Sequence, residues 1–78
     1  MTVSEHDVVV VLTRDLPEHK LRTGDVGAVV QFYASGQAYE VEFTTGSGQP
    51  LAVETLEPMD IRPLGDGEIL HSRRSSAA

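Results

Sequence analysis

The clearest alternation of apolar and polar positions along the chain lies between Tyr39 and Phe43. Tyr39, Val41 and Phe43 are separated by Glu40 and Glu42. A period of two, with aromatic and β-branched residues on one side, is typical of a strand that has one face in a core and the other in water. We therefore predict a strand here whose two glutamates face the solvent.

The residues before this strand predict its neighbour. In the segment 26–33, only Gln31 interrupts a run of apolar residues and glycine. Such a run predicts a central strand that is covered on both faces over part of its length. The connecting loop 34–37 contains Gly36, which can adopt the positive φ that short hairpin connections often need. The two strands are expected to be antiparallel neighbours.

The first apolar run, 7–12, reads D-V-V-V-V-L and is too short and too β-branched for a helix. It predicts a strand, but four consecutive valines leave open which residues face inward. Our interpretation places alternate residues, Val8, Val10 and Leu12, in the core and the other two, Val9 and Val11, under a loop.

A long loop is predicted at 13–23, where the sequence shows neither a helical nor a strand period. Leu16 and Leu21 are expected to pin it to the rest of the domain, since a loop of this length would otherwise lose its order to chain entropy. At its end, Gly24 predicts a turn, and Gly27 predicts a bulge or a close backbone contact.

The second half of the chain predicts two more strands. The turn sequence T-T-G-S-G-Q-P at 44–50 precedes a strand at 51–54, in which Leu51 and Val53 lie on one side. Pro58 prevents a continued central strand and predicts a one-turn helix, which is followed by a last strand at 59–64.

Five short strands, a long first loop and a one-turn helix before the last strand are typical of an all-β, SH3-like, partly open barrel. We assign residues 1–65 to this barrel. Residues 66–78 have small polar side chains toward their end and no periodicity, so we predict a disordered C-terminal tail.

Five sequence blocks support a family resemblance. D-V-V-V-V-L, G-D-V-G-A-V-V, A-Y-E-V-E-F, L-A-V-E-T-L and D-I-R-P-L occur in this order between Asp7 and Leu64. Together they resemble the bacterial family catalogued as domain of unknown function 4926, which has no assigned chemistry. More loosely, the segment 24–30 is similar to the barrel of the nitrile hydratase β subunit. By analogy of size, the resemblance implies the neutralising or accessory half of a bacterial two-gene pair.

Charge narrows the range of functions. Twelve acidic residues against six basic ones give a net charge of −6, and residues 1–65 hold ten of the acidic and four of the basic residues. Because nucleic-acid affinity depends on Lys and Arg that neutralise phosphates, this balance argues against a general nucleic-acid binder and favours a basic protein partner. The longest apolar run, 8–12, is far shorter than a membrane span, so a cytoplasmic protein without membrane association is expected.

No catalytic or metal site is predicted. The chain has no cysteine, its three histidines fall in separate segments, and a barrel of this size is expected to offer no cleft. We therefore expect a non-enzymatic protein-interaction module without a cofactor. Its candidate docking residues are the acidic side chains Glu40, Glu42 and Glu54, with Tyr33 as the candidate anchor.

Two alternatives stay open. Arg14, Lys20 and Arg22 lie in or beside the long loop and form the one place where a nucleic acid could bind, although three acidic residues are interleaved with them. The looser resemblance suggests instead a scaffold subunit similar to the nitrile hydratase barrel, whose partner chain would carry the metal. The sequence leaves the partner and the oligomeric state open.

Overall fold

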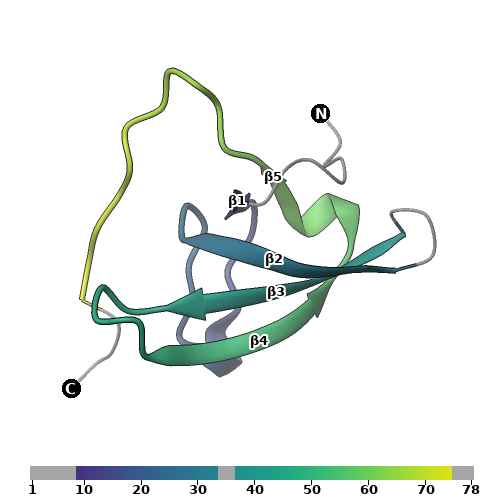
Figure 1. Cartoon of the computed structure of the whole chain (residues 1–78), viewed down its shortest axis with the longest axis horizontal. Coiled ribbons are helices and arrows are strands. Elements are labelled where there is room, and N and C mark those ends of the chain that lie inside the picture. The colour runs from purple at the N-terminus through teal and green to yellow at the C-terminus, as the bar shows by residue number, and fades with distance from the viewer. Residues whose placement is uncertain (1–8, 34–36, 75–78) are drawn as a thin grey trace.

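The computed structural model describes residues 9–33 and 37–74, and Figure 1 shows their arrangement. Within these residues, five strands form one sheet in which all neighbours are antiparallel, in the order β4-β3-β2-β1-β5. Two 3-10 turns complete the elements, and the second lies directly before β5. The elements are β1 (Val9–Leu12), η1 (Pro17–His19), β2 (Val26–Tyr33), β3 (Ala38–Thr44), β4 (Pro50–Leu56), η3 (Pro58–Asp60) and β5 (Ile61–Pro63).

The bent sheet surrounds a single core to which all five strands contribute. Tyr39 is 2% exposed, and the ring of Phe32 packs against it edge to face, with 5.4 Å between the centroids. Leu16 and Leu21 of the long loop are buried in the same core and pair with each other through an isolated bridge. The predictions of an all-β, five-stranded, partly open barrel and of a pinned loop are therefore confirmed.

The alternation predicted for β3 is confirmed. Tyr39, Val41 and Phe43 are buried, whereas Glu40 and Glu42 are partly exposed on the other face. The inner face of the sheet is thus the core face, and the outer face carries the glutamates. The residues of the hairpin loop before β3, 34–36, lie outside the described residues, so the expectation for Gly36 is not tested.

In β1, the structure confirms part of the predicted burial. Val10 and Leu12 belong to the core, and Val11 is 4% exposed as expected of a covered residue. Val9 is 39% exposed, so its predicted cover is wrong: it pairs with Ala28 of β2, which is also exposed. Val8 lies outside the described residues.

The prediction that β2 is covered on both faces over part of its length is wrong at Ala28 and Val30, although its place in the middle of the sheet is confirmed. Ala28 is exposed and Val30 is 55% exposed, because no second layer of the described chain lies over them. The β2–β3 register shifts between Val29 and Gln31, so that Val30 stands in a bulge. The high apolar content of β2 therefore supplies an exposed surface in addition to its share of the core.

The two glycines before and in β2 have the roles predicted for them. Gly24 has a φ of 96°, in the region that favours glycine. A Cβ atom on Gly27 would lie 2.6 Å from Cγ1 of Val41 and 2.8 Å from Cε1 of Phe43, so this position requires a glycine for close packing. The bulge lies instead at Val30.

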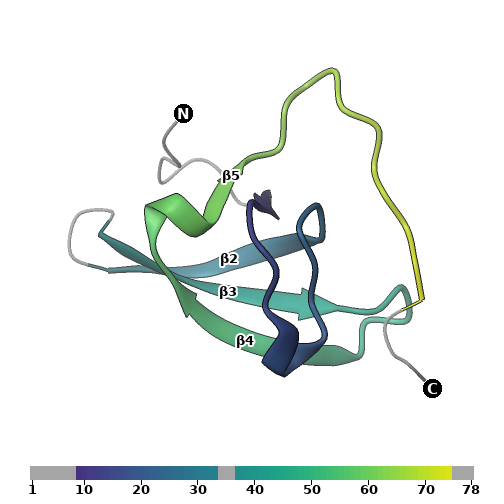
Figure 2. The same cartoon turned by 180° about the vertical axis from the view of Figure 1, so that it is seen from behind.

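After β5, residues 64–74 form a segment that we call the strap. It has no regular secondary structure, leaves β5, arches away from the sheet and returns to the turn between β3 and β4 (Figure 2). Its first part is held by two hydrogen bonds from the Arg62 guanidinium to the Glu68 carboxylate, at 2.6 and 2.7 Å. The strap overlaps the tail predicted to be disordered, whose last residues, 75–78, lie outside the described part of the chain.

Candidate functional site

Glu40 is the centre of a small hydrogen-bond network on the outer face of the sheet. The Tyr33 hydroxyl donates to its Oε2 atom at 2.7 Å, and the Thr55 hydroxyl donates to its Oε1 atom at 3.0 Å. The bond to Glu40 raises the pKa of Tyr33 above its ordinary value, because it stabilises the protonated phenol. Two of the predicted docking residues, Tyr33 and Glu40, are thus in direct contact.

Glu42 lies among exposed apolar side chains. The strand register places Val9, Ala28, Glu42 and Val53 in one row across four strands. Val9 is 39% and Val53 is 48% exposed. We define the acidic-apolar patch as the surface that combines these side chains with the neighbouring glutamate and the bulged valine: Val9, Ala28, Val30, Glu40, Glu42 and Val53.

Glu54 does not belong to this patch, and its predicted place beside Glu40 and Glu42 is wrong. It pairs with Val41, whose side chain is fully buried, so Glu54 lies on the inner side of the sheet. There its Oε2 atom is 2.8 Å from Nε2 of His19, in η1. Glu54 therefore contacts the long loop.

Arg14, the first residue of the predicted basic patch, is engaged within the protein. Its Nε atom donates to Oδ1 of Asp60 at 2.6 Å, and the Glu57 backbone N–H donates to Oδ2 of the same carboxylate at 2.9 Å. Burial alone would raise the pKa of Asp60, but these two donors outweigh it and lower the pKa below its ordinary value. This arginine is therefore part of a structural ion pair.

Lys20 and Arg22 are exposed, and neither side chain forms an ion pair with another described residue. Beside them, Asp15 accepts hydrogen bonds from the backbone N–H and the hydroxyl of Thr23, at 2.8 and 3.0 Å. These bonds lower the pKa of Asp15, so its carboxylate stays charged next to Arg22. The basic residues of the loop thus alternate with negative charge in space as well as in sequence.

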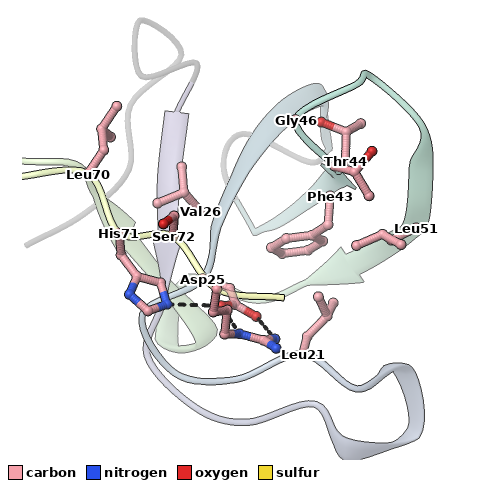
Figure 3. Close-up of a pocket in the computed structure, with 12 residues that line it drawn as sticks. Leu21, Asp25, Val26, Phe43, Thr44, Gly46, Leu51, Leu70, His71 and Ser72 are labelled. Atoms are coloured by element: carbon pink, nitrogen blue, oxygen red, sulfur yellow. Dashed lines mark hydrogen bonds and ion pairs between the residues drawn. The ribbon is translucent and has the colours of Figure 1, made fainter. Parts of the chain in front are cut away.

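The expectation of a barrel without a cleft is wrong. A pocket of about 440 Å³ opens between the barrel end and the strap (Figure 3). Its walls come from the long loop, from β2, β3 and β4 and from the strap, and a sequence pattern alone does not bring these segments together. Among its lining residues are Leu21, Asp25, Val26, Phe43, Leu51 and Leu70.

Asp25 is the buried charge of this pocket, with 9% of its surface exposed. Its Oδ1 atom accepts a hydrogen bond from Nε of Arg73 at 2.8 Å, and its Oδ2 atom accepts one from Nη2 of Arg73. The backbone N–H of Arg22 also donates to Oδ2, at 2.8 Å. Burial alone would raise the pKa of Asp25, but the arginine and the backbone donor together lower it.

His71 also lines the pocket and points toward Asp25 in Figure 3. Its Nε2 atom is 3.8 Å from Oδ1 of Asp25, beyond hydrogen-bond distance. Within residues 9–33 and 37–74, no three His, Cys, Asp or Glu side chains converge as metal ligands. Chemically, the pocket is suited to hold a forked cation through Asp25 and an apolar group on its other walls.

The pocket was missed because its charged pair joins residues 48 positions apart in the chain. The only local signal was the Gly24-Asp25 turn, which the sequence assigned to turn geometry. The Asp25 backbone N–H does bond to the Arg22 carbonyl at 2.9 Å, as expected of such a turn. Nothing in that local geometry indicates that the side chain is buried.

The fold and these surfaces define a small all-β protein with one open antiparallel sheet, an acidic outer face and a pocket at one end. The chain belongs to the family described as Domain of unknown function (DUF4926), whose model matches residues 5–63. Comparison with curated proteins and with solved structures returned no match. Asp25 thus lies within the part that matches the family, and Arg73 follows it. In the described part of the chain, no helix has the length and apolar character needed to cross a membrane.

Proposed function

We propose that this protein is a non-enzymatic protein-interaction module that binds a basic partner through the acidic-apolar patch. The observation that carries the proposal is the position of Glu40 and Glu42 among exposed valines on a sheet face that no described segment covers. Neither glutamate contributes to the core, so their alternation with core residues leaves a face that is free to meet another molecule.

The composition of the patch suits protein binding. Exposed valines at 9, 30 and 53 offer apolar area that gains free energy when a partner removes it from water. The two carboxylates select a partner with basic groups and increase its rate of encounter, since the whole chain carries a net charge of −6. Tyr33, which is 37% exposed and oriented by Glu40, is positioned as an anchor at the border of the patch. In the two-gene form of this hypothesis, the partner is the larger, co-encoded protein.

Two observations favour this proposal over its alternatives. The first observation disfavours an enzyme that uses the pocket. Both carboxylate oxygens of Asp25 accept hydrogen bonds from Arg73, so this buried acid is poorly suited to act as a general base. The second observation disfavours nucleic-acid binding. Of the three basic residues of the loop, Arg14 is already paired with Asp60, so fewer cations are available to neutralise phosphate groups. Within residues 9–33 and 37–74, no contact favours the nitrile hydratase-like scaffold.

The test is capture of a partner by charge variants of the tagged protein. Glu40→Lys with Glu42→Lys reverses both charges of the patch. The matched control, Glu18→Lys with Asp66→Lys, makes the same change in net charge at exposed positions away from it. We expect a partner captured from the native extract to be lost with the patch variant and kept with the control. Circular dichroism verifies that both variants fold.

Capture that is equal for both variants, or lost equally from both, would contradict the patch as the binding surface. A gel shift with RNA or DNA whose affinity falls steeply with salt would instead support the nucleic-acid alternative. Val30→Asp provides a second readout, because it removes apolar area at an exposed position that is not part of the core. We expect this variant to capture less of the partner than the wild type does.

A further inference from the structure

A buried carboxylate in the family-matched part of the chain is neutralised by a cation from outside that part. Asp25 lies directly before β2 at the end of the barrel, and Arg73 reaches it from the end of the strap. The same guanidinium donates from Nη2 to the backbone carbonyl of Lys20 at 3.0 Å. Three acceptors, the two Asp25 oxygens and the Lys20 carbonyl, therefore form a socket around one guanidinium.

We propose that this socket and the adjoining pocket recognise an arginine-bearing segment of a partner protein, and that Arg73 occupies the socket as an intramolecular competitor until such a segment displaces it. The site is separate from the acidic-apolar patch, so the two proposals stand or fall independently.

The arrangement of acceptors selects arginine over lysine. A guanidinium presents donors in a planar fork that matches the two oxygens of a carboxylate, whereas an ammonium group is a single point charge. Nε and Nη2 of Arg73 donate to Oδ1 and Oδ2 of Asp25, respectively, which is a bidentate arrangement. Nη2 also donates to the backbone carbonyl of Lys20. A lysine in the same place would satisfy fewer of these acceptors.

The apolar walls beside the socket indicate a peptide segment as the occupant. Leu21 and Phe43 line the pocket but belong to the core and are only 4% and 2% exposed, whereas Leu51 is 45% exposed and offers apolar area to a ligand. Leu70 of the strap also lines it but remains 67% exposed, so the strap leaves apolar area uncovered and about 440 Å³ of open space. A foreign segment with an apolar side chain near its arginine would bury area that the strap does not.

The strap is built to be displaced. It has no regular secondary structure, and its middle is exposed, with Ile69 at 94%. It is held to the barrel by the Leu64 backbone N–H, which donates to the Val9 carbonyl at 3.4 Å, by Glu68 through Arg62, and by Arg73 in the socket. Segments with few buried contacts open at low free-energy cost. Because Arg73 is tethered to the same chain, its effective concentration at the socket is in the millimolar range, and a partner segment must compete with it. A variant that lacks Arg73 is therefore expected to bind such a segment with higher affinity than the wild type does.

The experiment uses the strap's own sequence as the probe. A blocked peptide of residues 68–74 is titrated into isotope-labelled protein and followed by amide chemical shifts. Three forms are compared: the wild type, Arg73→Ala, and Arg73→Ala with Asp25→Asn. We expect the Arg73→Ala protein to bind with shifts at Leu21 and Phe43, the wild type to bind at least tenfold more weakly, and the double variant not to bind.

Two peptide variants test the chemistry of recognition. The Arg73→Lys peptide is expected to bind the Arg73→Ala protein several-fold more weakly, because it loses the fork. The His71→Leu peptide is expected to bind more tightly, because it adds apolar area to the pocket that His71 lines. If Arg73→Ala does not fold, Arg73→Gln replaces it, and displacement of the wild-type strap is followed through the amide signal of Arg73.

The proposal is overturned if wild type and Arg73→Ala bind the peptide equally, if neither binds at millimolar peptide, or if the lysine peptide binds as well as the arginine peptide. Sedimentation of the wild type over a range of concentrations tests whether the strap of a second copy of the protein occupies the socket. A dimer that disappears with Arg73→Ala would assign the socket to the strap of a second copy, and would overturn the assignment to a foreign partner.

Discussion

Asp25 and Asp60 flank the end of β1 and are held by the same kinds of donor. The backbone N–H of Leu12 bonds to the Asp25 carbonyl, and the backbone N–H of Thr13 bonds to the Asp60 carbonyl, both at 2.9 Å. The two residues are 9% and 6% exposed. Each carboxylate accepts from one arginine and from one backbone N–H. The two sites differ in the origin of the arginine.

Asp60 is satisfied from within the barrel, because Arg14 belongs to the long loop and the Glu57 N–H belongs to the start of η3. Its carboxylate and that of Glu57 form a reciprocal capping box. Asp25 depends on Arg73, which arrives at the end of the strap. The same ion-pair chemistry therefore closes the barrel at one aspartate and attaches a displaceable segment at the other. The following predictions test that difference.

The largest loss of stability is expected from Asp60→Ala. This change leaves the Glu57 N–H without its acceptor and releases Arg14, which joins the long loop to η3. We expect the free energy of unfolding to fall by about 2 kcal/mol, within the range measured for removing a buried acceptor. Urea denaturation followed by circular dichroism measures it, and a change below experimental error would show that Asp60 does not close the barrel.

A smaller loss is expected from Asp25→Ala, about 1 kcal/mol, because the freed Arg73 returns to water and, within the barrel, only the hydrogen bond from the Arg22 backbone N–H is lost. The distinguishing result is local: amide exchange should increase along the strap while the strands keep their protection. Global loss of protection equal to that of Asp60→Ala would show that the two sites are equivalent.

Acid should weaken both ion pairs. The folded-state pKa values of Asp25 and Asp60 lie below the ordinary value of 3.8. Their contribution to stability is thus complete above that pH and is lost as the pH falls through the lower folded-state values. We expect the wild type to lose stability in this acidic range, and Asp25→Asn and Asp60→Asn each to lose less. Urea titrations at pH 7 and at pH 3 measure the difference, and variants with the wild-type acid dependence would contradict it.

The smallest effect is expected from Glu68→Gln. The wild-type carboxylate accepts from Arg62 and from the Gly65 N–H, and these donors lower the pKa of Glu68 to about 2. Both side chains are more than a third exposed, so the pair contributes little to global stability. Amide exchange at Gly65 should become faster without a change in the urea midpoint. A shifted midpoint would show that the start of the strap belongs to the cooperative unit of the barrel.

Much of the fold could be predicted from the sequence, because strand pairing between chain neighbours depends on local signals. The alternation in β3, the turn at Gly24 and the proline at the start of η3 each correspond to the structure. The predictions that were wrong concern which faces of a strand are covered by other parts of the protein. Val30 is exposed because of a bulge and an uncovered sheet face, and neither feature is visible in the run of apolar residues that forms β2.

The candidate patch was predicted in part. Glu40 and Glu42 lie on the outer face as their alternation indicates, since both belong to one regular strand. Glu54 was misplaced because the face that it occupies depends on the register of β4 against β3, which pairs it with Val41. A shift of one residue in that register would have reversed the outcome.

By itself, the sequence determined five strands, their turns and the acidic outer face of β3, since all of these depend on residues close together in the chain. The family followed from the order of five such local blocks. Only the tertiary structure decided that Glu54 turns to the long loop, that a pocket opens at the barrel end and that Arg73 meets Asp25. Those features depend on register and on contacts across many intervening residues. Local propensity does not encode which distant charges meet, because that outcome is determined by the closure of the whole sheet.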